Sequence, residues 1–162
     1  MKRVKIAIYP GSFDPITKGH LDVLIKASEM FDKVIIAVSY NCNKQGFIKP
    51  EIRKELIQKS VSHLKNVEVD LFNGLTIEYA RKHNATVLLR GLRAVSDFEY
   101  EMQLSQTNSA LAQEIKTVFL ITKPEYSFIS SSTVKEIFLN NGNITQFVPQ
   151  PVEEYLTKYY KN

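Results

Sequence analysis

Hydrophobic residues along the chain fall into short continuous runs, separated by longer segments of mixed polarity. Two of these runs, Val34–Val38 and Thr86–Leu89, hold almost no charged or polar position. Continuous apolar runs are typical of strands buried on both faces, as in parallel sheets. The pattern predicts five strands, at Val4–Tyr9, Val34–Ser39, Val67–Phe72, Val87–Arg90 and Val118–Ile121.

The segments between these runs carry apolar residues at helical spacing. In the first of them, four positions form one stripe that should face the core: Leu21, Leu24, Ile25 and Ser28. In the fourth, Ser96 and Glu99 match a capping box, so Ser96 is expected as the N-cap. The expected helices are Gly19–Met30, Pro50–His63, Leu75–His83, Ser96–Ile115, Ser131–Leu139 and Val152–Tyr160.

Alternating strands and helices predict an α/β fold, a Rossmann-like doubly wound five-stranded parallel sheet with helices on both faces. We find no internal repeat and no Pro- or Gly-rich linker, so residues 1–162 are expected to form a single domain. In such folds ligands bind beyond the carboxyl ends of the strands. Candidate chemistry is therefore expected just after Tyr9, Ser39, Phe72, Arg90 and Ile121.

The composition favours some classes of ligand for this protein but does not identify one. Hydrophobic residues make up 44% and charged residues 23%, which is typical of a globular domain, and the net charge of +4 favours an anionic ligand. No apolar run approaches the ~18 residues of a membrane-spanning helix, so no membrane association is expected. Cys42 is alone, which excludes an internal disulfide and fits a cytoplasmic location.

The turn after the first strand, Pro10–His20, has the features of a phosphate site. It feeds a helix whose first N–H groups and positive dipole end attract anions. It matches neither the Walker A pattern nor G-x-G-x-x-G, which argues against a P-loop NTPase and a dinucleotide-binding enzyme. His20 stands at the start of that helix, where its imidazole can donate to a phosphoryl oxygen as charge develops.

Thr17-Lys-Gly-His20 resembles the [HT]-x-G-H signature of the nucleotidylyltransferase superfamily, and the twelve residues Tyr9–His20 resemble one of its families, the phosphopantetheine adenylyltransferases. The resemblance implies adenylyl transfer from ATP to 4'-phosphopantetheine, giving dephospho-coenzyme A and pyrophosphate in coenzyme A biosynthesis. The reaction would be a direct in-line attack with no covalent enzyme intermediate. His20 would stabilise the transition state at the α-phosphate.

Two of the five arginines, Arg90 and Arg93, lie at the end of the expected fourth strand. The guanidinium fork suits phosphate oxygens. Arg90–Ala94 and the following Asp97–Leu104 again resemble the family, in its most distinctive stretch. The resemblance implies that the attacking phosphate is held by Ser12, Lys44 and Arg90, with Lys44 and Arg90 counted as catalytic. It also implies that Thr76 contacts the pantetheine arm.

The segment Pro124–Thr133 places hydroxyl groups before an expected helix, which suits a triphosphate. It resembles the second superfamily motif, I-S-S-x. The family often carries a basic residue near Leu139, so Lys135 or another group would have to replace that contact. The ATP-binding residues implied by the resemblance are Ser12, Phe13, His20, Gly91, Leu92, Arg93, Glu101, Tyr126, Ser127, Phe128, Ile129, Ser130, Ser131 and Ser132.

The family also implies Mg²⁺ bound mainly through the ATP phosphates, with no dedicated protein ligands, a homohexamer, and feedback binding of coenzyme A. Two alternatives stay open. A sister enzyme would adenylylate or cytidylylate another phosphate acceptor such as nicotinate mononucleotide or glycerol phosphate, against which the Arg90–Leu104 stretch argues. A non-enzymatic nucleotide- or nucleic-acid-binding protein would show a basic stripe with clustered aromatics. The eight Tyr and nine Phe are dispersed, so no nucleic-acid partner is expected.

Overall fold

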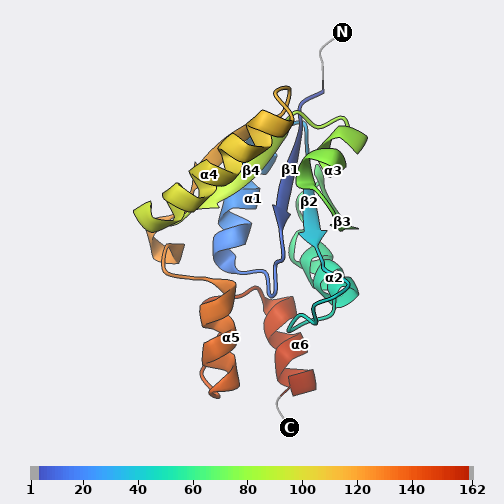
Figure 1. The fold of residues 1–162 in the computed structure, drawn as a ribbon. Helices are drawn as coiled ribbons and strands as arrows, with labels where there is room; N and C mark the ends of the chain where they lie inside the picture. The colour runs from blue at the N-terminus through green and yellow to red at the C-terminus, as the bar shows by residue number, and fades with distance from the viewer. Residues whose placement is uncertain (1–3, 161–162) are drawn as a thin grey trace.

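The computed structural model describes residues 4–160 and contains one five-stranded sheet (Figure 1). All strand pairs are parallel, in the order β3-β2-β1-β4-β5, which confirms the predicted doubly wound α/β fold. The order reverses direction between β1 and β4, which is where such folds bind ligands. The strands are β1 (Ile6–Gly11), β2 (Lys33–Ser39), β3 (Val67–Phe72), β4 (Val87–Leu92) and β5 (Lys116–Ile121).

Six α-helices and one short 3₁₀ helix, η1, follow the strands within the described part of the chain. Figure 1 shows α5 and α6 beyond the arrowheads of the strands, below the sheet. The helices are α1 (Lys18–Met30), α2 (Pro50–Ser60), α3 (Thr76–Lys82), α4 (Val95–Leu111), η1 (Pro124–Tyr126), α5 (Ser131–Leu139) and α6 (Gln150–Tyr160).

The sheet separates two hydrophobic cores, because alternate side chains of a strand point to opposite faces. On β1, Ala7 and Tyr9 pack into the larger core with α1, α2, α5 and α6, whereas Ile8 packs with α3 and the end of α4. All three side chains are at most 4% exposed. Burial on both faces explains why the strand sequences contain continuous apolar runs.

The predicted apolar stripe of α1 was wrong in part. Ile25 is 41% exposed, and the buried residues of the helix include Asp22. The Asp22 carboxylate is satisfied at this depth, because it accepts hydrogen bonds from Lys26 Nζ (2.7 Å) and from the backbone N–H of Lys123 (2.9 Å). The buried side of α1 therefore includes a charged residue whose hydrogen bonds are satisfied, beside the apolar Val23, Leu24 and Ala27.

The predicted N-cap of α4 was also wrong. The helix begins at Val95 with Ala94 as N-cap and no side-chain cap. The carboxylate of Asp97 lies in the first turn and accepts from the backbone N–H of Arg93 at 3.1 Å. A carboxylate near a helix start interacts favourably with the helix dipole, so Asp97 favours this helix start although no side chain caps its N–H groups.

Among the helices of residues 4–160, none combines the length and the apolar character needed to cross a bilayer.

Candidate active site

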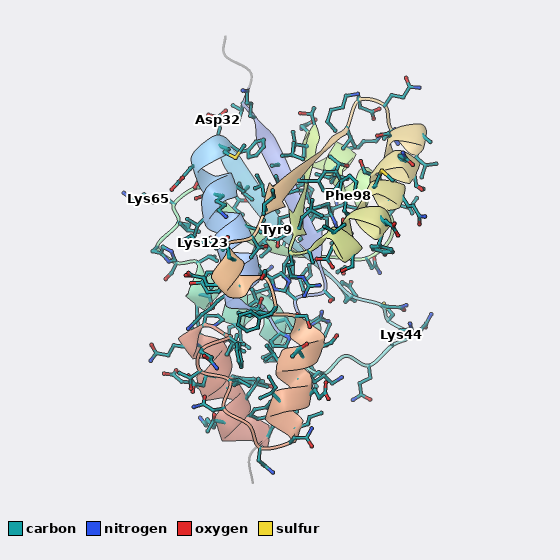
Figure 2. The ribbon with its side chains drawn as sticks, turned by 90° about the vertical axis from the view of Figure 1, so that its left-hand side faces the viewer. Tyr9, Asp32, Lys44, Lys65, Phe98 and Lys123 are labelled. Carbon is teal, nitrogen blue, oxygen red and sulfur yellow. The ribbon has the colours of Figure 1, made fainter. Side chains whose placement is uncertain are left out.

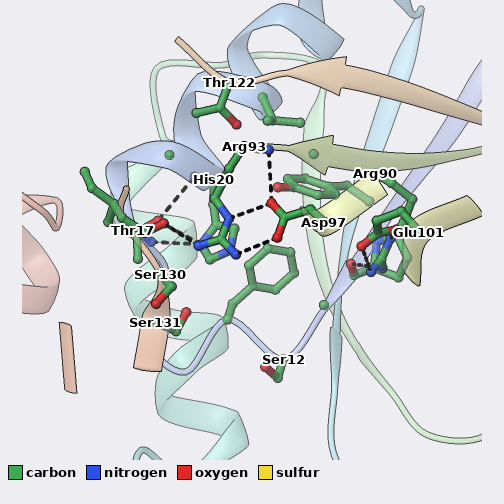
Figure 3. Close-up of a pocket in the computed structure, with 18 of the residues that line it drawn as sticks. Ser12, Thr17, His20, Arg90, Arg93, Asp97, Glu101, Thr122, Ser130 and Ser131 are labelled. Carbon is green, nitrogen blue, oxygen red and sulfur yellow. Dashed lines mark hydrogen bonds and ion pairs between the residues drawn. The ribbon is translucent and has the colours of Figure 1, made fainter. Parts of the chain in front are cut away.

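A pocket of about 480 Å³ lies at the carboxyl ends of β1 and β4 (Figure 3). Its walls come from the turn after β1, the first turn of α1, the start of α4 and the start of α5. Predicted site residues lining it are Ser12, Phe13, His20, Arg90, Gly91, Arg93, Glu101, Ile129, Ser130 and Ser131. Segments up to about 120 residues apart in sequence thus meet where parallel α/β folds bind ligands.

The turn after β1 is tightly packed around Phe13. This residue is 3% exposed and has a positive φ of 46°. Its ring meets those of Tyr9 and His20 edge-on, with centroids 5.3 Å and 5.1 Å apart. A Cβ on Gly11 would lie 3.0 Å from the Phe13 ring, so a larger residue there would push the ring out of its present position. The packing of Phe13 therefore orients the imidazole of His20.

Thr17 and His20 form a reciprocal cap at the start of α1. The backbone N–H of Thr17 donates to His20 Nδ1 at 3.0 Å, and the backbone N–H of His20 donates to Thr17 Oγ1 at 3.3 Å. Because Nδ1 accepts a hydrogen bond from a backbone N–H, the ring proton of the neutral imidazole lies on Nε2. The capping contact thus leaves an Nε2–H donor available to the pocket.

The His20 imidazole is neutral at physiological pH. Burial, and then the positive charges of Arg93 and Arg90, lower its pKa from 6.5 to about 4. In the neutral ring Nδ1 is free to accept from the backbone N–H of Thr17, while Nε2 carries the proton and donates.

Arg90 and Glu101 join β4 to α4 through a two-pronged ion pair. Arg90 Nε and Nη2 donate to the two carboxylate oxygens of Glu101 at 2.6 Å and 2.7 Å. Arg90 Nη1 also donates to the carbonyl oxygen of Pro10 at 3.3 Å. Burial lowers the pKa of Arg90, but the hydrogen bonds and charge of Glu101 outweigh it and leave the pKa raised. Both oxygens of Glu101 are engaged, so this residue orients Arg90 in the pocket wall.

Arg93 joins β4 to the segment before α5. Its guanidinium pairs with Asp97 at 3.2 Å (Figure 3), and its Nη1 donates to the carbonyl oxygen of Ile129 at 3.1 Å. Ser130 is the N-cap of α5, and its hydroxyl accepts from the backbone N–H of Thr133. Ser131 donates to the carbonyl oxygen of Pro15 at 2.8 Å. Cationic groups and two helix N-termini therefore face one space, an arrangement that suits polyphosphate.

Several predicted residues lie outside the pocket wall. Lys44 is exposed on the loop after β2, which stands away from the body of the molecule in Figure 2. Thr76 is the first residue of α3, on the opposite side of the sheet from α1. Residues adjacent to wall-forming segments, without lining the wall themselves, are Leu92, Tyr126, Ser127, Phe128 and Ser132.

Other residues line the pocket without having been predicted as site residues. Thr17 bonds to His20, three residues later, and Asp97 bonds to Arg93, four residues earlier. These helical spacings are the features of the sequence that could have identified both residues. Thr122, 4% exposed at the end of β5, had no such signal. The remaining ones are Tyr9, Pro10, Gly11, Gly19, Val23, Ser96 and Tyr100.

Residues 8–137 of the chain match the cytidylyltransferase-like family. A phosphopantetheine adenylyltransferase from Gloeothece citriformis is 56% identical over 155 residues, which cover 96% of this chain and 99% of the relative. The enzyme of the same name from Clostridium perfringens is 52% identical over 153 residues, covering 94% and 93% of the two chains. A third relative of that name, from Crocosphaera subtropica, is 53% identical over 156 residues, covering 96% of this chain and 99% of the relative.

The fold is shared more widely than the sequence. A crystal structure of a Vibrio parahaemolyticus protein, provisionally assigned as a nicotinate-nucleotide adenylyltransferase, superposes with a TM-score of 0.73. The alignment covers 96% of this chain and 93% of the other at 18% identity, so it supports the fold alone.

Proposed function

Because this chain belongs to the cytidylyltransferase-like family and, within it, to the phosphopantetheine adenylyltransferases, we propose that its strand-end pocket transfers the adenylyl group of ATP to 4'-phosphopantetheine. The enzyme is a nucleotidyltransferase of coenzyme A biosynthesis, and its products are dephospho-coenzyme A and pyrophosphate. The observation that carries this conclusion is identity above 50% over nearly the whole chain. It does not favour a different phosphate acceptor or a nucleic-acid-binding role.

The reaction we propose is an in-line displacement. An oxygen of the phosphopantetheine phosphate bonds to the α-phosphorus of ATP, while the bond from that phosphorus to the oxygen bridging to the β-phosphate breaks. Positioning and charge stabilisation supply the catalysis, without a protein nucleophile. His20 Nε2–H donates to a non-bridging α-phosphate oxygen, whose negative charge grows in the transition state. Thr17 supports this role, because its backbone N–H occupies Nδ1.

The acceptor phosphate is assigned to Arg90, Ser12 and Lys44. Arg90 is held by Glu101 and reaches toward Pro10 beside the turn after β1, which supports this placement. Lys44 stands on an exposed loop, so its contact requires the loop to fold toward the pocket when substrate binds. Thr76 is assigned to the pantetheine arm by family resemblance only.

ATP is assigned to the wall between α1 and α5. Side-chain contacts are proposed for wall residues that include Phe13, Arg93, Ile129, Ser130 and Ser131. Glu101 acts through Arg90, because Arg90 engages both of its oxygens. The other implied residues contribute through the backbone of their segments: Gly91, Leu92, Tyr126, Ser127, Phe128 and Ser132.

Mg²⁺ is proposed to enter with ATP, held by phosphate oxygens and water. Residues 4–160 contain no group of three His, Cys, Asp or Glu side chains placed to hold a metal ion, which is compatible with this form of binding. The ion would neutralise phosphate charge. A cytoplasmic location is proposed from the lone cysteine, Cys42.

A homohexamer is proposed for the assembly, and α4 offers a surface for it. Only Glu101 is buried among the 17 residues of this helix. Its exposed apolar residues are Val95, Phe98, Tyr100, Met102 and Leu111. Val95, Phe98 and Met102 are spaced by three and four positions and so share one side of the helix, and an exposed apolar surface of this kind is typical of a protein interface. Feedback binding of coenzyme A is proposed from the family alone, with inhibition competitive against phosphopantetheine as its test.

The test of the reaction is pyrophosphate release from ATP and Mg²⁺ with different acceptors. Release with phosphopantetheine, at a kcat/KM far above that with nicotinate mononucleotide or glycerol phosphate, is the expected result. Equal or faster release with another acceptor would contradict the assignment.

A further inference from the structure

Arg53 of α2 is a buried cation to which neither the family motifs nor the pocket assigns a role. It is 5% exposed, and its guanidinium reaches the carboxyl end of the sheet. Nη1 donates to the carbonyl oxygen of Ser12 at 2.5 Å and to that of Ser39 at 3.2 Å. One nitrogen therefore joins the turn after β1 to the end of β2, the two segments from which Ser12 and the Lys44 loop extend.

The cost of burying this charge is not offset by a direct ion pair. Arg53 takes part in no ion pair among residues 4–160, and its Nε is buried there without a hydrogen-bond partner. Burial lowers the pKa of Arg53, although the more distant charges of Asp14 and Glu51 act in the opposite direction. A buried charge held mainly by two carbonyl oxygens is a costly way to stabilise a fold, which favours a role in geometry.

Asp14 continues the link from the turn to the base of the Lys44 loop. Its carboxylate accepts from the backbone N–H groups of Phe47 at 2.7 Å and Ile48 at 2.8 Å. A Cβ on Gly46 would lie 2.9 Å from Asp14 Oδ2 and 3.7 Å from Arg53 Nη2. The loop therefore passes directly over both charged groups, two residues after Lys44.

We propose that Arg53 is a positioning residue for the acceptor phosphate, which it serves by fixing Ser12 and the base of the Lys44 loop relative to each other. This role rests on the proposed function, because Ser12 and Lys44 are the groups assigned to that phosphate. The groups that face ATP are held differently. His20 is fixed by Thr17, and Arg93 by Asp97. Loss of Arg53 should therefore weaken phosphopantetheine binding more than ATP binding.

The test compares R53K and R53Q with a control, R81K, in the full-length enzyme. Lysine keeps the charge but lacks the fork that bonds two carbonyls, and glutamine loses the charge. Arg81 is an exposed arginine of α3 paired with Glu78 and Glu114, well outside the pocket wall. Small displacements of reacting groups cost up to about 100-fold. We expect the KM for phosphopantetheine to rise on the order of tenfold or more in both Arg53 variants, while the KM for ATP changes by less than about threefold.

Hydrogen exchange supplies a readout that does not depend on activity. Faster exchange of the Phe47 and Ile48 amides in R53K and R53Q, but not in R81K, is expected. Equal increases in both KM values, or unchanged KM values with unchanged exchange, would overturn the positioning role. If the unmodified enzyme released no pyrophosphate with phosphopantetheine, the proposed function would fail. The exchange data would then still decide whether Arg53 holds the loop.

Discussion

The imidazole of His20 is held so that one nitrogen accepts and the other donates. Its Nδ1 accepts from the backbone of Thr17, and its ring packs edge-on against Phe13. Orientation comes from the backbone and from packing, so it does not depend on the charge state of a second side chain. Substitutions at His20 should therefore change the chemical step more than the fold.

We expect H20A to lower kcat on the order of 10²- to 10³-fold, because it removes a preorganised donor to the α-phosphate. Steady-state kinetics measures the loss, and circular dichroism checks that the variant is folded. The matched control is H63A, since His63 is exposed just beyond α2. Near-normal turnover in H20A would exclude the assigned role.

The low pKa of His20 predicts a specific pH dependence. Folding lowers this pKa from 6.5 to about 4, so the folded enzyme binds the proton less well than the unfolded chain. The contribution of His20 to the free energy of unfolding is therefore complete above pH 6.5 and decreases as the pH falls toward 4. An NMR titration of the free enzyme should show a neutral His20 ring down to about pH 5. In R93A the same resonance should titrate at higher pH, and an unchanged titration would contradict the contribution of Arg93.

At the scale of elements, the N-terminal turns of two helices form part of the pocket wall. The first turns of α1 and α5 face the pocket, capped by Thr17 and Ser130. Ser127 was predicted beside Ser130 as an ATP contact, but its hydroxyl donates to the carbonyl oxygen of Pro124, away from the pocket wall. Two serines of one motif thus have different roles, because Ser127 bonds within η1 and Ser130 caps α5.

This difference separates two alanine variants. S130A removes the cap of α5 and should lower the free energy of unfolding by about 1 kcal/mol. It should also raise the KM for ATP severalfold, because the cap orients N–H groups toward the triphosphate. S127A should leave the KM for ATP unchanged. Thermal denaturation and ATP titrations measure both effects, and the reverse ranking would place the nucleotide on the other side of η1.

At the scale of the whole molecule, α4 runs along one flank of the sheet in Figure 1, and its residues Val95, Phe98 and Met102 are exposed. Its sequence lacks the one-sided pattern of a surface helix, because one face carries Glu101 toward Arg90 and apolar residues occupy exposed positions. A helix with this distribution is expected to pack against another subunit.

The double variant V95D/M102D should therefore dissociate the proposed hexamer, because carboxylates would be buried at the subunit contact. Light scattering on a sizing column should give six times 18.6 kDa for the unmodified enzyme and a smaller mass for the variant. L139D introduces a carboxylate at an exposed apolar residue of α5, and its mass should not change. A monomeric unmodified enzyme would refute the assembly.

The strands and helices were predictable in order and approximate extent. Burial on both faces gives the central strands β2 and β4 continuous apolar runs, a pattern that can be recognised without knowing which strands are neighbours. The ends were less predictable, because they depend on contacts across the fold. The helix α4 begins at Val95, where Asp97 accepts a hydrogen bond from Arg93, and α1 buries Asp22, which accepts one from Lys123.

The sequence alone determined the order of elements, the turn that starts α1 and the chemical groups at the strand ends, because these follow from local periodicity and short motifs. Only the tertiary structure decided how those groups pair. Arg90 bonds to Pro10, 80 residues away, and Arg53 bonds to Ser12, 41 residues away. Such contacts depend on which strands are neighbours in the sheet, and the parallel order β2-β1-β4 brings these residues to one edge. The lowered pKa of His20 has the same origin, because it comes first from burial in the folded chain and then from the charges of Arg93 and Arg90.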